Sequence, residues 1–190
     1  MRKSPDLKDA IAEAFIAEFN VSGPRLTLDE VTARIHISKK TIYKYYRSKE
    51  DIYEYILRQT IDYILAKQKE IRSNAELSTR EKLFAILTIV TPYESVLDTT
   101  RLGELKEYEP DFYEKLVEAY YVEWAAVEEV MDEAQKEGLF KEGIRSTMLI
   151  RIISGAMSSF LAGTFLKNSN ISYTQAIHNL AEVILNGSLK

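Results

Sequence analysis

The sequence predicts an all-α protein, in which a small N-terminal group of helices precedes a larger helical part. Apolar residues recur at three- and four-residue spacing through most of the 190 residues. Residues that cap helix starts, and Gly or Pro residues that stop helices, separate these stretches. No segment shows the apolar and polar alternation of a strand, and no internal repeat interrupts the chain.

Composition argues against several classes of protein. The chain has no cysteine, which excludes disulfides and thiolate sites. Its N-terminus lacks the uninterrupted apolar core of a signal peptide. The most apolar stretch, residues 148–166, is broken by Arg151, and no apolar run approaches the ~20 residues that a membrane span needs. We therefore expect a cytoplasmic protein without a membrane partner.

The first helix is expected to begin at Ser4, with Pro5 in its first turn and Asp6 near the positive end of the helix dipole. Gly23 and Pro24 stop it. Its apolar stripe has four-residue spacing, and consists of Leu7, Ile11, Phe15 and Phe19.

A second, short helix follows. Thr27 caps its start, and Glu30 stands three residues later as the partner in a capping box. The helix can run only to about Arg34, because His36 and Ile37 form a turn.

Ser38 then caps a third helix, which is expected to run from Lys39 to about Tyr45. Ser48 caps a long fourth helix that extends to near Arg72. Two short helices that meet at a tight turn describe a helix-turn-helix module.

The third helix stands out by its charge. Residues 34–49 hold six basic side chains and no acid, in a chain of net charge −4. Residues 1–60 carry 11 Lys and Arg against 9 Asp and Glu, whereas residues 61–190 carry 14 against 20. Lys39 and Lys40 stand at the helix start, where acids would stabilise the helix better. The pattern predicts contact with a polyanion, and a solvated charged face is the alternative.

The later helices are less sharply marked. A fifth helix is expected to begin at Ser78 or Thr79 and to run to Leu97, with a kink at Pro92. Further helices are expected over residues 100–107, 110–137, 146–167 and 172–186.

The last two of these helices have wide apolar faces that include small residues. A two-fold interface of four helices would bury such faces, and ordinary core helices are the alternative. The residues expected at a dimer interface are Met148, Ile152, Gly155, Ser159, Ile177, Leu180 and Ile184.

Residues 26–52, LTLDEVTARIHISKKTIYKYYRSKEDI, resemble the DNA-binding signature of the TetR family of bacterial transcription regulators. In that pattern a Thr caps the second helix, a V-S-x-x-T-L-Y core builds the recognition helix, and S-K-E opens the fourth. Two positions depart from it. His36 stands where the family usually has Gly, so we expect a positive φ there. Lys40 replaces a frequent small residue and is expected to alter which bases are read.

The resemblance implies a DNA-binding domain over residues 1–48, joined by the long fourth helix to a ligand-binding and dimerisation domain over 49–190. It places Ser38, Lys39 and Lys40 nearest to base edges, where lysine can donate to guanine. It implies phosphate contacts from Thr27, Thr41, Tyr43, Lys44 and Lys49. Thr27 is in addition a helix cap, and a solvated charge is the alternative for Lys49.

The resemblance also implies a homodimer through the last two helices and an effector cavity within the fourth to eighth helices. Few charged residues are expected to face inward, so the effector is expected to be largely apolar. Aromatic residues at helical spacing are also ordinary core residues. The candidates for the cavity wall are Tyr63, Phe84, Thr88, Tyr93, Tyr108, Phe112, Tyr120, Tyr121, Trp124 and Phe160.

Enzyme chemistry finds no support in the sequence. There are two histidines, His36 and His178, and no glycine-rich phosphate loop or G-x-S-x-G motif. We expect no cofactor and no metal. The sequence predicts a ligand-responsive regulator, a repressor that binds a palindromic operator as a homodimer and is released by a small-molecule effector. A helical protein-interaction module without DNA binding is the alternative.

Overall fold

The computed structural model describes residues 6–93, 97–162 and 165–189, without the side chains of residues 100, 120–123, 161, 162 and 167. Within these residues the protein is helical, and an isolated bridge between Phe140 and Leu189 is the one pairing of extended backbone. The predicted all-α fold class is confirmed.

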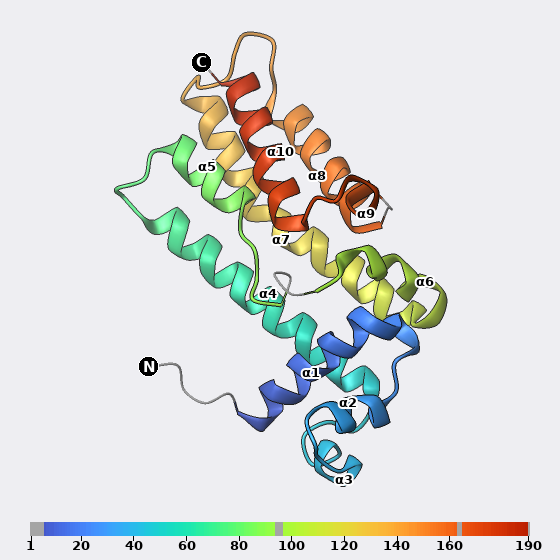
Figure 1. The fold of residues 1–190 in the computed structure, drawn as a ribbon. Coiled ribbons are helices and arrows are strands. Elements are labelled where there is room, and N and C mark those ends of the chain that lie inside the picture. The colour runs from blue at the N-terminus through green and yellow to red at the C-terminus, as the bar shows by residue number, and fades with distance from the viewer. Residues whose placement is uncertain (1–5, 94–96, 163–164, 190) are drawn as a thin grey trace.

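The N-terminal helices lie together at one end of the molecule, and the long helix α4 leads from them toward the other end (Figure 1). Each of α2, α3 and α4 begins at its predicted cap. The bounds are α1 (Leu7–Ser22), the 3-10 helix η1 (Gly23–Arg25), α2 (Leu28–Arg34), α3 (Lys39–Ile42) and α4 (Lys49–Ser73).

The C-terminal helices form a bundle in which α5 and α10 pack on α7 and α8 (Figure 1). Two shorter elements, η2 and α6, connect α5 to α7. The bounds are α5 (Thr79–Leu87), η2 (Thr99–Glu104), α6 (Leu105–Tyr108), α7 (Pro110–Lys136), α8 (Ser146–Ala162), α9 (Phe165–Ser169) and α10 (Tyr173–Ser188).

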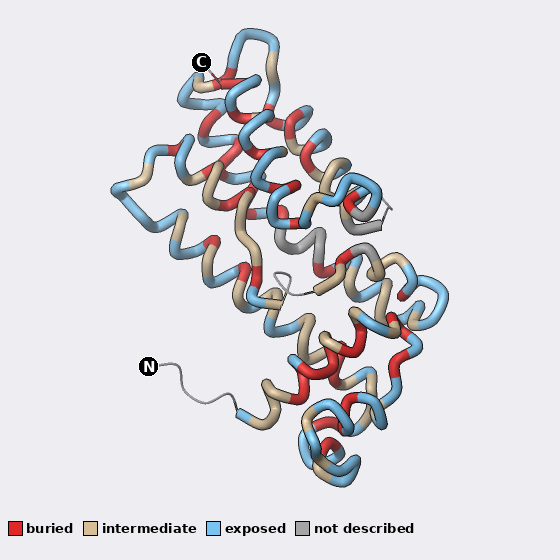
Figure 2. The backbone as a smooth tube through the Cα atoms, viewed as in Figure 1, coloured by how far each residue is buried: buried red, intermediate tan, exposed pale blue. Residues whose placement is uncertain are grey.

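Two main hydrophobic cores hold these parts. The N-terminal core is built on α1, which is buried over most of residues 11–19 (Figure 2). It also takes in Ile52 and Tyr53 of α4 and Leu105 of α6. The first turns of α4 therefore share the core of the preceding helices, and the domain boundary between residues 48 and 49 stays a prediction.

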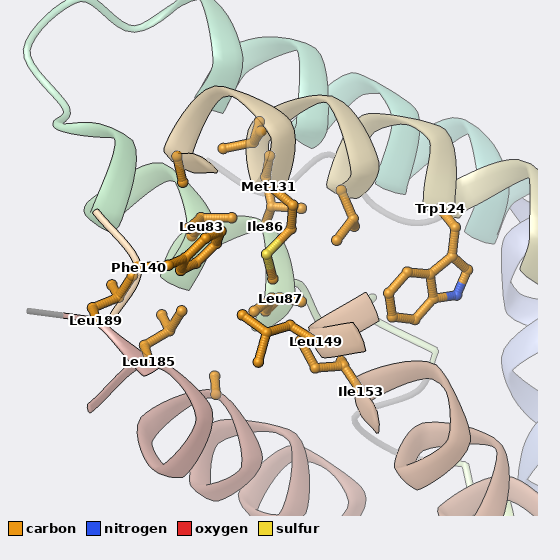
Figure 3. Close-up of a cluster of buried hydrophobic side chains, with 14 residues drawn as sticks. Leu83, Ile86, Leu87, Trp124, Met131, Phe140, Leu149, Ile153, Leu185 and Leu189 are labelled. Carbon is orange, nitrogen blue, oxygen red and sulfur yellow. The ribbon is translucent and has the colours of Figure 1, made fainter. Parts of the chain in front are cut away.

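The C-terminal core fills the bundle between α5, α7, α8 and α10 (Figure 3). Leu83 and Met131 are fully buried in it, and Trp124 lies at the end of the cluster opposite Phe140 and Leu189. A smaller cluster joins Leu166 of α9 to α10.

Helix α5 is shorter than the sequence predicts. It ends at Leu87, where the hydroxyl of Thr88 donates to the carbonyl oxygen of Phe84 at 2.7 Å. The following residues 89–91 are β-branched and precede Pro92, and both features disfavour helical backbone. The expected extension to Leu97 is therefore wrong.

One other predicted helix end differs from the structure, and two predicted helices extend into residues outside the described ranges. The α-helical part of α3 ends at Ile42 rather than Tyr45, although the N–H of Tyr45 still donates to the carbonyl of Ile42 at 2.9 Å. The expected cap at Ser4 lies outside the described residues. The predicted helix over 146–167 is described as α8 and α9, and residues 163–164 between them lie outside the described ranges.

Candidate nucleic-acid interface and effector cavity

The start of α2 is held by a complete capping box. The backbone N–H of Thr27 donates to Glu30 Oε2 at 2.7 Å, and the N–H of Glu30 donates to Thr27 Oγ1 at 3.4 Å. The predicted cap is confirmed. Since the Thr27 hydroxyl also donates to Glu30 Oε2 at 2.9 Å, a phosphate contact by Thr27 would be made in addition to the cap.

A left-handed residue makes the turn between α2 and α3. His36 has φ +54°, as the sequence predicts, and the N–H of Ile37 donates to the carbonyl of Thr32 at 3.1 Å. Arg34 Nε donates to Glu18 Oε1 at 2.5 Å. This ion pair fastens the end of α2 to α1 and so fixes the direction in which α3 leaves.

Ser38 caps α3, because its Oγ accepts the N–H of Thr41 at 3.2 Å. Ile42 is fully buried in the N-terminal core. With Ile42 facing inward, the first turn of α3 presents its other side chains outward.

The residues expected to reach bases, Ser38, Lys39 and Lys40, are all exposed. Lys39 Nζ lies 2.8 Å from Asp29 Oδ2, and this hydrogen bond raises the pKa of Lys39. An exposed pair of this kind contributes little to stability. A nucleic-acid acceptor can therefore replace Asp29 at small cost.

The tyrosines after α3 divide between the surface and the core. Tyr43 is 53% exposed and Tyr45 is 40% exposed, whereas Tyr46 is buried and donates to a backbone carbonyl of α1 at 3.0 Å. Burial raises the pKa of Tyr46. Tyr45 shares this exposed surface with Tyr43 and Lys44.

Lys49 is placed differently from the expectation. Its Nζ lies 2.5 Å from Glu109 Oε1 and donates to the carbonyl of Pro24 at 2.9 Å. The Lys49 and Glu109 side chains are only 22% and 15% exposed. The structure therefore gives Lys49 an internal role, tying the start of α4 to η1 and α7, in place of the expected phosphate contact.

A cavity of about 270 Å³ lies between the N-terminal helices and the C-terminal bundle. Its wall includes Phe15, Ile16 and Phe19 of α1, one face of α4 from Tyr53 to Gln68, and parts of α5, α6, α7, α8 and α10. That face of α4 extends for roughly 22 Å at 1.5 Å per residue. The described wall residues are apolar or neutral polar, without a charged side chain.

Three of the ten candidates for the cavity lie on this wall, namely Tyr93, Phe112 and Trp124. The side chains of Tyr120 and Tyr121 lie outside those that the structure describes. The other five candidates do not lie on the wall, and each has a different environment.

Two of these five are half-buried residues at the end of α5. Phe84 packs edge-on against His178 of α10, with 5.1 Å between ring centroids. The Thr88 hydroxyl donates to the carbonyl oxygen of Phe84 at the end of α5. Tyr63 of α4 is half-buried and does not lie on the wall, although Ile56 and Ile64 of the same helix do.

The remaining two lie outside the cavity. Tyr108 is 37% exposed, and the Arg25 guanidinium carbon lies 4.8 Å from its ring centroid. Phe160 stacks on Phe165 of α9, with 5.7 Å between ring centroids. The expected placement of these five side chains on the wall of this cavity is corrected accordingly.

The sequence analysis missed the contribution of α1 and of Tyr53 to the wall. Phe15 and Phe19 belong to the predicted apolar stripe of the first helix, and the structure places them both in the N-terminal core and on the cavity wall. One signal was present in the sequence. Ile16 widens the apolar face of α1 beyond the single stripe that a small three-helix module needs.

Tyr53 is a buried residue of the cavity wall, on the side formed by α1 and the start of α4. Its side chain is stacked on Phe112, with ring centroids 4.8 Å apart, and meets Phe15 edge-on at the same distance. Its hydroxyl oxygen is buried and has no hydrogen-bond partner among the described residues. Burial raises the pKa of this hydroxyl, and the carboxylates of Glu109 and Glu50 add to the effect.

The outer face of α8 is open to solvent. Met148 is 62% exposed and Ile152 is 46% exposed, and the small residues Gly155 and Ser159 lie exposed along the same helix. On α10, Val183 is 70% exposed and had not been singled out in the sequence. These side chains form what we call the α8–α10 face.

The predicted interface residues of α10 lie deeper. Ile177 is 2% exposed and packs with Leu166 and Tyr173, so it belongs to the core of the same chain and not to the open face. Leu180 and Ile184 are half-buried against the C-terminal core. The expectation for Ile177 is wrong, because the side of α10 that carries it faces inward.

The described residues offer neither a metal site nor a membrane span. No group of three or more His, Asp or Glu side chains is arranged to hold a metal ion. None of the described helices combines the length and apolar character required to cross a membrane.

Comparison with known proteins agrees with this geometry. Residues 11–56, which run from α1 into α4, match the family model described as bacterial regulatory proteins, tetR family. Over 180 residues the chain is 23% identical to YvaF of Bacillus subtilis (strain 168), an uncharacterised HTH-type transcriptional regulator. The alignment covers 95% of this chain and 94% of YvaF.

Solved structures share the whole fold. The ketosteroid transcriptional regulator KstR2 of Mycobacterium tuberculosis is 16% identical, with a TM-score of 0.70 over 99% of this chain and 97% of that one. FadR of Bacillus subtilis, solved in complex with stearoyl-CoA, is 16% identical, with a TM-score of 0.63 over 94% and 98%. The capped α2, the left-handed turn and these matches together support a likeness to the TetR family of transcription regulators, whose family model matches residues 11–56.

Proposed function

We propose that the protein is a repressor that binds a palindromic operator as a homodimer and leaves it when a small-molecule effector occupies the cavity. The observation that carries this proposal is the composition of the cavity wall. Side chains of α1 and of the start of α4 face the same space as side chains of α5, α7 and α8. A bound effector would therefore touch the core of the DNA-binding helices directly.

The DNA-binding surface is proposed to be the exposed side of α3 and the turn after it. Ser38, Lys39 and Lys40 would face base edges, since they lie exposed at the start of the helix. Phosphate contacts would come from Thr27, Thr41, Tyr43 and Lys44, together with the exposed Tyr45 and Arg47.

The α8–α10 face is proposed as the dimer interface. Met148, Ile152 and Val183 expose apolar surface there, and Gly155 and Ser159 permit close approach of a second helix. In a two-fold dimer the two α3 helices would have to meet successive major grooves about 34 Å apart.

The effector is proposed to be a largely apolar molecule without a net charge. The described cavity wall offers no ionised partner, and burial of an unpaired charge is costly. One solved structure of the same fold is a ketosteroid transcriptional regulator, and another is a complex with stearoyl-CoA. Ketosteroids and the stearoyl chain are both large and apolar. The acyl chain of stearoyl-CoA is apolar, whereas its CoA group carries several negative charges. These descriptions therefore support an apolar body in the effector, and the proposed lack of net charge rests on the cavity wall alone.

Release is proposed to follow from a shift between two arrangements of the N-terminal helices. The Lys49–Glu109 ion pair lies one helical turn from the stacked rings of Tyr53 and Phe112, on the same two helices. An effector that separates these rings would also displace the ends of α4 and α7 that the ion pair joins. The recognition helices would then lose the spacing that fits the operator.

Selection of bound duplexes from a random DNA pool tests the DNA-binding part of the proposal. We expect the purified protein to select a palindrome, and a Lys39→Ala/Lys40→Ala variant to lose that selectivity. Recovery of random sequence by the wild-type protein would contradict the proposal and favour a protein-interaction module. Repression and release are tested by a reporter placed behind the selected operator.

A further inference from the structure

Asp29 of α2 is an acid that stands against the most basic part of the chain. Its Oδ2 lies 2.8 Å from Lys39 Nζ, at the start of α3. Residues 26–48 contain one other acid, Glu30, and its carboxylate is held in the capping box of α2. A carboxylate on a surface that meets DNA repels the phosphates. Asp29 therefore opposes DNA binding unless the DNA offers it a hydrogen-bond donor.

The charged ends of this pair are open to a ligand. The side chain of Asp29 is 73% exposed, and that of Lys39 is 47% exposed. A lysine ammonium carries three N–H donors, and a carboxylate has two acceptor oxygens. The bond between the two side chains uses one donor and one oxygen. Two N–H donors of Lys39 and the second oxygen of Asp29 therefore remain to face a base pair.

These remaining groups match the major-groove edge of a G·C base pair. Guanine presents two neighbouring acceptors, N7 and O6, and cytosine presents the donor N4 amino group beside O6. Guanine O6 and cytosine N4 are hydrogen-bonded to each other, so they lie roughly 2.9 Å apart. Lys39 Nζ and Asp29 Oδ2 are 2.8 Å apart, which is nearly the same spacing. The edge of an A·T pair has its donor between two acceptors, so it does not fit this order of groups.

We propose that Asp29 is a base-reading residue, and that together with Lys39 it recognises one G·C base pair in each half of the operator. Lys39 donates to guanine N7 and O6, and Asp29 accepts from the N4 amino group of cytosine. On phosphates alone, or on a base pair with a different order of groups, the carboxylate opposes binding and so adds to specificity. This rests on the proposed function only in taking the exposed side of α3 as the DNA-binding surface.

The test uses the operator that the full-length wild type selects from a random pool. Each of the four base pairs is placed in turn at the G·C position of one half-site, and fluorescence anisotropy gives the affinities. Wild type is expected to prefer G·C to A·T roughly tenfold. Asp29→Ala and Lys39→Ala should each lose most of this preference. The double variant should lose little more than either single variant, because the two side chains act on one base pair.

A cytosine analogue separates direct reading from a mere orienting of Lys39. In 2-pyrimidinone the N4 amino group is absent, so Asp29 would lose its donor. Replacing the cytosine by this analogue should weaken the binding of wild type several-fold more than that of Asp29→Ala, roughly the effect of one hydrogen bond to a charged group. An equal loss in both proteins would overturn the contact between Asp29 and cytosine.

Binding to a random duplex measures the second part of the proposal. Asp29→Ala should bind random DNA more tightly than wild type, with a salt dependence raised by about one ion, because Lys39 is then free for a phosphate. Asp62→Ala is the control, since Asp62 is an exposed acid on α4, thirteen residues beyond the start of that helix. It should change neither quantity. Thermal unfolding of Asp29→Ala checks the fold, because an acid in the first turn of α2 also stabilises the helix.

The outcomes distinguish this inference from the proposed function. A selected palindrome without a conserved G·C pair, or a base preference that is the same in Asp29→Ala as in wild type, would overturn the role of Asp29 and leave operator binding standing. Tighter binding of Asp29→Ala to all duplexes by one common factor would likewise reduce Asp29 to a repelling charge and contradict base reading. Selection of random sequence by the wild type would contradict both proposals.

Discussion

At the scale of single residues, Gly23 shows how closely the two parts of the chain approach. It links α1 to η1 with φ +63°, and a Cβ there would lie 2.6 Å from Glu104 Oε2 and 2.9 Å from Arg101 Nη1. Arg101 Nη1 in turn donates to the carbonyl of Phe19 at 3.4 Å. A side chain at position 23 would therefore strain the backbone and disturb the contact between α1 and η2.

Gly23→Ala is expected to lower the free energy of unfolding by roughly 1–3 kcal/mol, mainly because φ +63° with ψ −153° is a backbone conformation that other residues avoid, with a smaller contribution from moving the ends of the Arg101 and Glu104 side chains. Gly138→Ala is the matched control, because Gly138 has φ +68° and nothing within 4 Å of the added Cβ. Gly138→Ala should lower the free energy of unfolding by less, because only the backbone conformation opposes the added Cβ. Urea denaturation measures both, and equal losses would argue against the contact with η2.

The surface residues of the recognition region carry a second prediction. Tyr43→Ala and Lys44→Ala should weaken binding to all duplexes, and Lys44→Ala should lower the salt dependence of binding by about one ion. Lys39→Ala or Lys40→Ala should relax the sequence preference by about 1–3 kcal/mol per discriminated base pair. Fluorescence anisotropy against salt on specific and random duplexes makes the comparison. Unchanged affinity and salt slope in all four variants would show that the DNA surface lies elsewhere.

Sequence reasoning succeeded at this scale where the partners are close in the chain. Thr27, Ser38 and His36 act through residues no more than five positions away, so their roles in caps and turns could be predicted. Lys49 and Tyr53 meet Glu109 and Phe112, about sixty residues later. No local pattern carries such a pairing, and both residues were misassigned or missed.

At the scale of helices, the start of α4 and the start of α7 are joined by the Lys49–Glu109 ion pair. Removal of one partner from such a partly buried pair leaves the other carboxylate or ammonium without compensation. We expect Lys49→Met to lower the free energy of unfolding by roughly 1–3 kcal/mol, with the double variant Lys49→Met/Glu109→Gln recovering part of the loss.

The same variants separate the internal role of Lys49 from a phosphate contact. An internal role predicts a coupling energy between positions 49 and 109 in denaturation experiments on the free protein. A phosphate contact predicts instead an unchanged stability of Lys49→Met and a salt dependence of DNA binding lowered by about one ion. The second pattern would restore the original assignment.

Helix boundaries were predictable where a cap marks the start and less so where a helix merely ends. Ser48, Ser78 and Ser172 each accept the N–H three residues on and begin α4, α5 and α10 as expected. The end of α5 was placed ten residues too late. Its apolar pattern continues past Leu87, but β-branched residues and Pro92 take the backbone out of the helix there.

At the scale of the whole molecule, the proposed dimer interface on the α8–α10 face can be tested by charge. Met148→Lys and Val183→Lys would place charges in the centre of an apolar contact, where they cannot be paired. We expect both to convert the dimer to a monomer in sedimentation experiments, and to reduce operator affinity through the lost second half-site. Leu65→Lys is the control, since Leu65 is 41% exposed on α4 and lies outside this face. Intact dimers in all three variants would exclude the face.

The cavity wall has a consequence for how proteins with this architecture diversify. Because Phe15, Phe19 and Tyr53 serve both the N-terminal core and the cavity, a substitution that enlarges or reshapes the cavity there also changes the stability of the DNA-binding helices. At the other end of the cavity, around Thr60, Gln68 and Met157, the wall residues lie on α4 and α8 and outside the N-terminal core. We therefore expect substitutions at that end to change ligand binding with less effect on the stability of the DNA-binding helices than substitutions beside α1.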